Sequence, residues 1–227
     1  HCSIANARTL GDVGERFIKR TWPSAEAQLA NVADEIAYNN HDVDDGLRAG
    51  LITIEQLREV GLFANAHDQV LLRWPDLEDR RTVHEVIRRM IGCQVEDLMR
   101  ASNEALDAAR PEHPDDVRAA GEILVRMSPE GREAHLELKR FLREALYRHY
   151  RVHRMAVKAQ RTVAALFAAC MEDARVLPPR TQARANALEL QHGESGRARA
   201  VADYIAGMTD RFAIAEHQRL YAMTELT

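Results

Sequence analysis

The sequence is poor in the features that mark disulfide scaffolds, membrane spans and secreted chains. Only three of its 227 residues are cysteines, and Cys2, Cys93 and Cys170 lie far apart without a Cys-x-x-Cys spacing. This pattern argues against a zinc ribbon, a redox pair or a disulfide framework. No apolar stretch approaches the roughly 20 residues of a membrane span, and the N-terminus has no signal pattern. We therefore expect a cytoplasmic protein with no membrane partner.

Aromatic residues and helix breakers are also scarce, and their scarcity indicates the fold class. Aromatics make up 5% of the chain, with 11 glycines and 7 prolines, whereas hydrophobic residues reach 46% and charged residues 29%. Such a chain is rich in helix formers and poor in the β-branched and aromatic runs of strands, which predicts an all-α fold. The net charge of -4 gives no general attraction for nucleic acid or an anionic membrane.

Apolar residues recur at helical spacing along most of the chain, which predicts long amphipathic helices. The predicted helices cover residues 24–48, 53–61, a short stretch around 70–72, 76–109, 130–147, 152–172 and 197–224. Thr53 with Gln56 is typical of a capping box, and Asp76 and Ser128 are expected to cap the helices that follow them. The stretch from Gly193 to Gly196 is expected to be a flexible joint.

The helix over residues 24–48 carries the residues with the clearest chemical meaning. At about 100° per residue, Asp34, Tyr38 and Asp42 form one stripe along a helix. A carboxylate can ligate a metal, and a phenol with a carboxylate can hold a sugar hydroxyl. A solvated acidic helix end is the alternative interpretation. Asp34 and Tyr38 stand among apolar and small residues, however, so we expect the acid to face apolar neighbours, where it would need a partner.

Several stretches resemble a known family. The segment from Glu26 to Gly50, with the run DEIAYNNHD over residues 34–42, looks like the hallmark segment of the dGTPase-like deoxynucleoside triphosphate triphosphohydrolases of the HD superfamily. Residues 201–212, VADYIAGMTDRF, are similar to the family's HD-associated C-terminal region, and residues 84–92 and 147–149 also match. The resemblance implies a helical HD architecture and covers the C-terminal half of such an enzyme. Residues 1–110 would be the last part of the catalytic core, and residues 111–227 the HD-associated region.

The resemblance also implies a reaction and roles for three residues. Members of this family hydrolyse a dNTP to the deoxynucleoside and tripolyphosphate, with a divalent metal held by a His, a His-Asp pair and a distant Asp. Asp34 matches the distant Asp, whereas Tyr38 and Asp42 match positions that contact the deoxyribose. Mn, Mg, Fe, Co and Zn are not distinguished by these residues. A homo-oligomer is expected as well.

The sequence departs from the family pattern upstream of Asp34. The first His and the His-Asp pair precede the distant Asp in the family, yet only His1 precedes Asp34 here. The dipeptides His41-Asp42 and His67-Asp68 both follow Asp34 and are expected by chance. Because one carboxylate is a poor metal site, we expect this polypeptide alone to be inactive and to retain no metal.

A basic segment from Lys139 to Arg161 has eight positive side chains against the single acid Glu144. We expect Arg148, Arg151 and Arg154 to contact phosphate or single-stranded nucleic acid, with Tyr147 and Tyr150 as stacking groups. The alternative is a pair of helices whose long cationic side chains cover apolar surface. The segment also supports a second function class, a regulatory or oligomerisation module that binds a regulatory nucleotide or single-stranded nucleic acid without catalysis.

Overall fold

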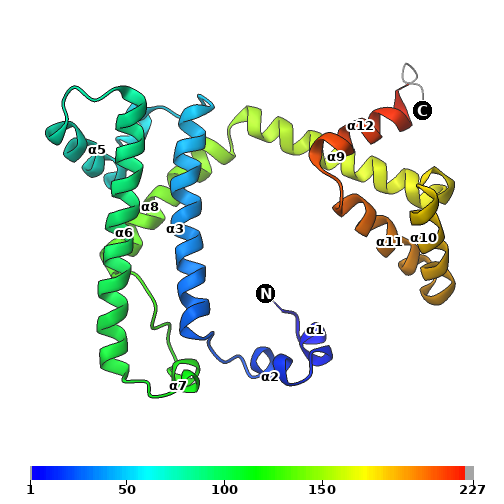
Figure 1. Ribbon diagram of the computed structural model, residues 1–227, viewed down its shortest axis with the longest axis horizontal. Helices are drawn as coiled ribbons and strands as arrows, with labels where there is room; N and C mark the ends of the chain where they lie inside the picture. The colour runs from blue at the N-terminus through cyan, green and yellow to red at the C-terminus, as the bar shows by residue number, and fades with distance from the viewer. Residues whose placement is uncertain (1, 223–227) are drawn as a thin grey trace. The chain divides into compact units, whose positions relative to one another are not determined.

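The computed structural model describes residues 2–222, and every regular element in this range is helical (Figure 1), which confirms the all-α prediction. The chain forms two compact units, His1–His149 and Tyr150–Thr227. The boundary predicted after residue 110 divides the catalytic core from the HD-associated region, which is a different division from that between the compact units. It stays a prediction. Over the described residues, no helix is long and apolar enough to cross a lipid bilayer.

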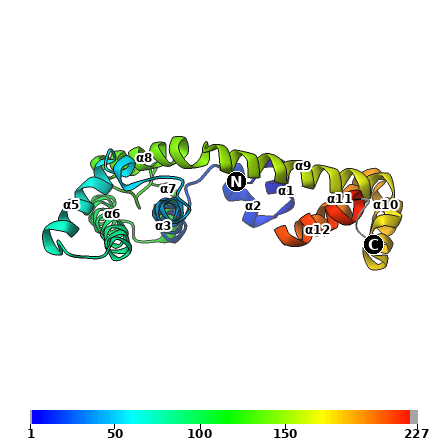
Figure 2. The same cartoon turned by 90° about the horizontal axis from the view of Figure 1, so that it is seen from above.

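The first unit contains eight α-helices and a π-helical turn within the described residues. They are α1 (Ile4–Thr9), α2 (Asp12–Ile18), α3 (Ala25–Arg48), α4 (Ile54–Leu57), α5 (Gly61–Arg73), α6 (Asp79–Ala109), α7 (Pro114–Ala119), α8 (Pro129–Leu142) and η1 (Arg143–Tyr147). The long helices α3 and α6 pack against each other, and α8 contacts both (Figures 1 and 2).

The main core of this unit lies where α3, α5, α6 and α8 meet. Val43, Phe63, Met90 and Leu138 are fully buried there, one from each helix. Burying a side chain of this size contributes about 1.5–3 kcal/mol, so the cluster fixes how the four helices pack. The helix α3 is thus held by its inner face, and its outer face is left for other contacts.

Local signals confirm two predicted helix starts and contradict two other boundaries. The Thr53–Gln56 capping box opens α4, and the Ser128 hydroxyl accepts from the Gly131 amide at the start of α8. Asp76 does not cap the next helix, because Leu77 N–H bonds to the Trp74 carbonyl in a turn and α6 begins only at Asp79. Gly61 begins α5 rather than ending a helix, since α4 stops at Leu57.

The second unit contains α9 (Tyr150–Glu172), the 3-10 turn η2 (Ala174–Val176), α10 (Pro179–His192), α11 (Glu194–Ala206) and α12 (Asp210–Tyr221). Its core joins Cys170, Ala185 and Val201 from three helices. The expected joint at Gly193–Gly196 is instead a tight packing point. Gly196 lies inside α11, where a Cβ would stand 2.1 Å from the Leu188 carbonyl oxygen, so only glycine fits.

The prediction of one continuous final helix over residues 197–224 is wrong, because two helices, α11 and α12, cover this range. The chain leaves α11 at Gly207, and the Thr209 hydroxyl accepts from the Phe212 amide, which starts α12 as a separate helix. An N-cap of this kind favours a new helix over continuation of the old one. The predicted end at Thr224 lies outside the described residues.

Candidate functional site

The stripe predicted on α3 faces away from the core of the first unit. Asp34 is exposed, Tyr38 is 59% exposed and Asp42 is half-buried, while Ile36 and Val43 on the inner side of the helix are buried. The expectation that Asp34 faces apolar neighbours is therefore wrong. Its apolar neighbour Ile36 points to the opposite side, because residues two apart on a helix are separated by about 200°.

Asp42 has a partner that periodicity on α3 does not reveal. The Tyr147 hydroxyl donates a hydrogen bond to the Asp42 carboxylate, and Tyr38 lies close enough to act electrostatically on the same phenol. Burial and then the hydrogen bond to Asp42 raise the pKa of the Tyr147 phenol, so the phenol keeps its proton. The arrangement joins Tyr38, Asp42 and Tyr147 into one group of polar side chains.

Local backbone geometry brings Tyr147 to this place. Tyr147 ends the π-helical turn η1, in which the Arg148 amide donates to the Arg143 carbonyl over 3.2 Å. Next to it, Leu146 packs against Gly46 of α3, where a Cβ would stand 2.8 Å from Ile52 Cδ1 and 3.3 Å from Leu146 Cδ1. The absence of a side chain at Gly46 lets the turn approach α3 closely, and short π-helical turns often occur at functional sites.

A buried polar network supports α3 beside the stripe. His135 on α8 is 4% exposed, its Nδ1 lies 3.1 Å from Gln94 Oε1, and its Nε2 lies 3.3 Å from Asn39 Nδ2. We assign a neutral ring that donates from Nδ1 and accepts at Nε2, since the Gln94 oxygen can only accept. Burial lowers the pKa of His135, and Glu35, 3.4 Å from Nε2, opposes that shift.

Glu35 and His135 also line a cavity of about 500 Å³ beside the stripe. Its walls come from α3, α8 and the loop after Gly121, and they combine apolar side chains such as Val32 and Ile123 with the charged Arg132. This volume is in the range of small-molecule sites. None of Asp34, Tyr38 and Asp42 lines it, so it adjoins the predicted site without containing it.

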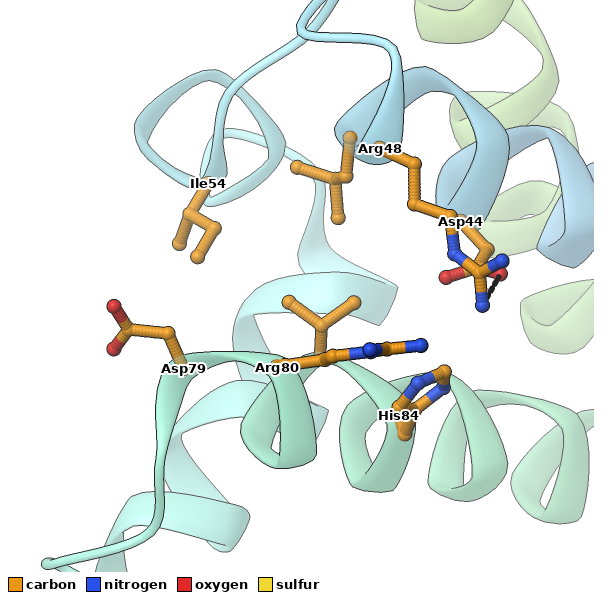
Figure 3. Close-up of a pocket in the computed structure, with 8 residues that line it drawn as sticks. Asp44, Arg48, Ile54, Asp79, Arg80 and His84 are labelled. Carbon is orange, nitrogen blue, oxygen red and sulfur yellow. Dashed lines mark ion pairs between the residues drawn. The ribbon is translucent and has the colours of Figure 1, made fainter.

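A second pocket lies where the end of α3, the start of α4 and the start of α6 meet (Figure 3). Arg48, Arg80 and His84 gather at one end, with Ile54 and Asp79 at the other. Asp44 Oδ2 stands 2.9 Å from Arg48 Nη2 and so offsets its charge. The pocket therefore mixes both charge signs and selects neither an anion nor a cation.

The described residues do not form a complete metal site. Within residues 2–222, no group of three or more His, Cys, Asp or Glu side chains is arranged to hold a metal ion. His67 is buried and stacks on Phe63 at 5.8 Å between ring centroids, and Asp68 pairs with Arg58. Of the two carboxylates on the stripe, Asp42 accepts a hydrogen bond from Tyr147, which leaves the exposed Asp34 carboxylate as the group that fits a divalent ion.

The basic segment crosses the division between the two compact units at 149/150. In the first unit, Lys139, Arg140 and Arg148 each have an acidic partner, for Arg148 the Glu144 carboxylate at 2.6 Å. In the second unit, Arg151 lies over the Tyr150 ring. The predicted role of Arg148, Arg151 and Arg154 as phosphate or nucleic-acid contacts stays a prediction.

Sequence reasoning missed how Tyr147, Glu35 and His135 relate to the stripe. Tyr147 is 105 residues from Asp42, and helical periodicity carries no information across such a distance. The one signal available was that residues 147–149 match the same family as the stripe. For His135, a lone histidine on an amphipathic helix gives no sequence sign of burial.

Comparisons with known proteins find one matching domain model and several similar proteins. Residues 125–219 match the model of the phosphohydrolase-associated domain. A "Deoxyguanosinetriphosphate triphosphohydrolase-like protein" of Bordetella pertussis is 53% identical over 98% of this chain and 56% of its own length. Proteins of the same name from Thiobacillus denitrificans and Ralstonia nicotianae are 52% and 50% identical over the whole chain. The chain spans 56–58% of the length of these relatives. The chain thus corresponds to the C-terminal part of dGTPase-like proteins.

Proposed function

We propose that this chain supplies the sugar-binding face and one metal ligand of a dNTP triphosphohydrolase, which converts a dNTP and water to a deoxynucleoside and tripolyphosphate. The observation that carries the proposal is the group formed by Tyr38, Asp42 and Tyr147 on the outer face of α3, with Asp34 on the same stripe. Relatives that are about half identical are named as triphosphohydrolase-like, which supports the same class of reaction.

In this proposal the three polar side chains hold the deoxyribose. The Asp42 carboxylate accepts from Tyr147 and has lone pairs left to accept from a sugar hydroxyl. The Tyr38 ring, exposed and one helical turn earlier, covers the sugar and leaves little room for a 2'-hydroxyl. Such a fixed grip aligns the bond to be hydrolysed and is the physical basis for choosing deoxyribose over ribose.

Asp34 is proposed as a ligand to the divalent ion, with the remaining ligands coming from residues outside this chain. When bound, such an ion polarises phosphate and activates water. One exposed carboxylate binds a divalent ion weakly. We therefore expect the 227-residue polypeptide alone to release no tripolyphosphate from any dNTP, whichever divalent ion is added.

The alternative class, a non-catalytic module that binds nucleotide or nucleic acid, is favoured by one observation. Arg154 on α9 is exposed, and no acid pairs with it anywhere in residues 2–222. If this is the function, a protein that joins this chain to the unmatched part of a relative would bind anions without hydrolysing dNTPs.

The test joins this chain to the part of the Bordetella pertussis relative that it does not match. The joined protein should hydrolyse dNTPs, and Asp34→Asn should remove both the metal and the activity. Asp42→Ala should lower kcat/KM by roughly ten- to a hundredfold with metal retained, because the sugar hydroxyl loses its acceptor and an unpaired buried donor costs about 1–3 kcal/mol. Tyr147→Phe should lower it less, since Asp42 is still present.

Tyr38→Ala should in addition reduce the preference for dNTPs over NTPs. Asp44→Asn is the matched control, because Asp44 lies on another side of α3 and pairs with Arg48. If the Asp42 and Tyr38 variants behave like the Asp44 control, the stripe is a solvated helix face and the proposal fails.

A further inference from the structure

A pocket of about 430 Å³ lies between α9 and α12 in the second unit. The side chains that line it are those of Lys158, Arg161, Thr162, Ile214, His217 and Gln218. Two are cationic, three others carry groups able to donate hydrogen bonds, one is apolar, and none is acidic. The two pockets described above for the first unit each contain acidic side chains, so this composition differs from theirs.

None of the residues that the structure describes neutralises the cations of this pocket. In the part of the chain that the structure describes, neither Lys158 nor Arg161 has an acid within ion-pair distance. The pocket between α10 and α11 gives the contrast. There Arg184 Nη2 stands 2.7 Å from Asp203 Oδ2, and Asp203 also pairs with Arg199, so the local charge is offset.

Glu216 on α12, next to His217 in the sequence, is paired with residues outside the pocket. The Glu216 carboxylate stands 3.0 Å from Arg219 and accepts from the Tyr204 hydroxyl at 3.5 Å. The Tyr221 hydroxyl donates to the Ala165 carbonyl, which fastens the end of α12 to α9. The helix therefore presents His217 and Gln218 to the pocket and directs its carboxylate to other partners.

We propose that this pocket binds the phosphate chain of a small phosphorylated ligand. Lys158 and Arg161 supply the charge, and Thr162 and Gln218 supply hydrogen bonds, with a ring N–H of His217 as a further donor. The volume is in the range of small-molecule sites. A single nucleic-acid strand would need a longer track that included Arg154, whereas α12 supplies groups only beside Lys158 and Arg161. The proposal does not depend on the function assigned to α3.

The experiment titrates the full 227-residue chain with tripolyphosphate, ATP and adenosine by calorimetry. Tripolyphosphate and ATP should both bind and adenosine should not, because the shared triphosphate is the group recognised. If ATP binds much more tightly than tripolyphosphate, the ligand is a nucleotide; if the two are equal, it is free polyphosphate. Lys158→Gln with Arg161→Gln should weaken binding at least about tenfold, since hydrogen bonds to charged groups contribute on that order.

The matched control is Arg180→Gln with Arg211→Gln, which removes two charges from the same unit outside this pocket. It should leave binding within about twofold, and circular dichroism should show both variants as helical as the parent. Equal loss in the two double variants would overturn the proposal, as would unchanged binding in the pocket variant. Tighter binding of a short oligothymidylate, weakened as strongly by Arg154→Gln as by the pocket variant, would assign the surface to nucleic acid instead.

Discussion

The outer face of α3 and the basic face of α9 both present charged side chains, but only the first is positioned by the rest of its unit. Asp42 is held by Tyr147 from another element, and α3 is supported from behind by Asn39 and His135. On α9, Arg154, Lys158 and Arg161 fall within about 60° of one another around the helix, yet α12 covers only part of that face. Positioned groups suit recognition of one geometry, whereas long free cations suit recognition of charge.

This contrast has an energetic side. Fixing Tyr147 and Asp42 before a ligand arrives removes part of the entropy cost of binding, whereas Lys158 and Arg161 on α9 lose their rotamer freedom only when an anion binds. We therefore expect changes near α3 to alter stability as well as function, and changes on α9 to alter mainly binding. The predictions below test this difference, from the largest expected effect to the smallest.

Gly46→Ala should destabilise the fold by about 1–3 kcal/mol, because its Cβ would stand 2.8 Å from Ile52 Cδ1 and force the packed side chains apart. Gly92→Ala is the matched control, since Gly92 also lies inside a long helix but has nothing within 4 Å of the added Cβ. It should stabilise the protein by roughly 0.5–1 kcal/mol. Urea unfolding of both variants measures the difference, and equal effects would mean that the contact of η1 with α3 is not tight.

Acidification should weaken the first unit through His135. Burial lowers the pKa of this histidine in the folded state, so below about pH 6.5 the unfolded chain takes up a proton that the folded chain resists. The free energy of unfolding should therefore fall as the pH decreases from about 6.5 toward the lowered pKa. Arg132 and Lys139 favour the neutral ring, and Glu35 opposes them.

Two variants separate His135 from the other titrating groups. His135→Gln should flatten the dependence of unfolding free energy on pH in this range. Glu35→Gln should steepen it, because the charge that favours the imidazolium is removed. Urea unfolding at several pH values between about 5 and 7 gives both slopes, and identical slopes in the two variants would exclude His135 as the source.

Replacing Arg148, Arg151 and Arg154 together with glutamine should change stability least. The Arg148–Glu144 pair is exposed and contributes at most a few tenths of a kcal/mol. Binding of nucleotide or single-stranded DNA should nevertheless weaken, and the loss should shrink as salt rises. If neither the substitutions nor salt changes binding, the arginines do not bind the ligand, and their long side chains only cover apolar surface.

The sequence was enough to predict the helical fold, the extent of α3 and the stripe, because these depend on local spacing. The Thr53 and Ser128 caps were also predicted, since both motifs lie within four residues. Periodicity could not show which side of α3 is buried against α6 and α8, and the exposure of Asp34 was therefore mispredicted. The break at Gly207 was missed because the apolar spacing continues on both sides of it.

The π-helical turn η1 makes the placement of Tyr147 depend on the number of residues in the turn as well as on their identity. Its hydrogen bond from Arg148 to Arg143 spans five residues, one more than in an α-helix. If the same residues were wound as an α-helix, the extra residue would rotate the end of the turn by up to about 100° around the helix axis, away from Asp42. A change that gives η1 α-helical winding without removing a residue would thus separate Tyr147 from Asp42 while both side chains remain in the protein.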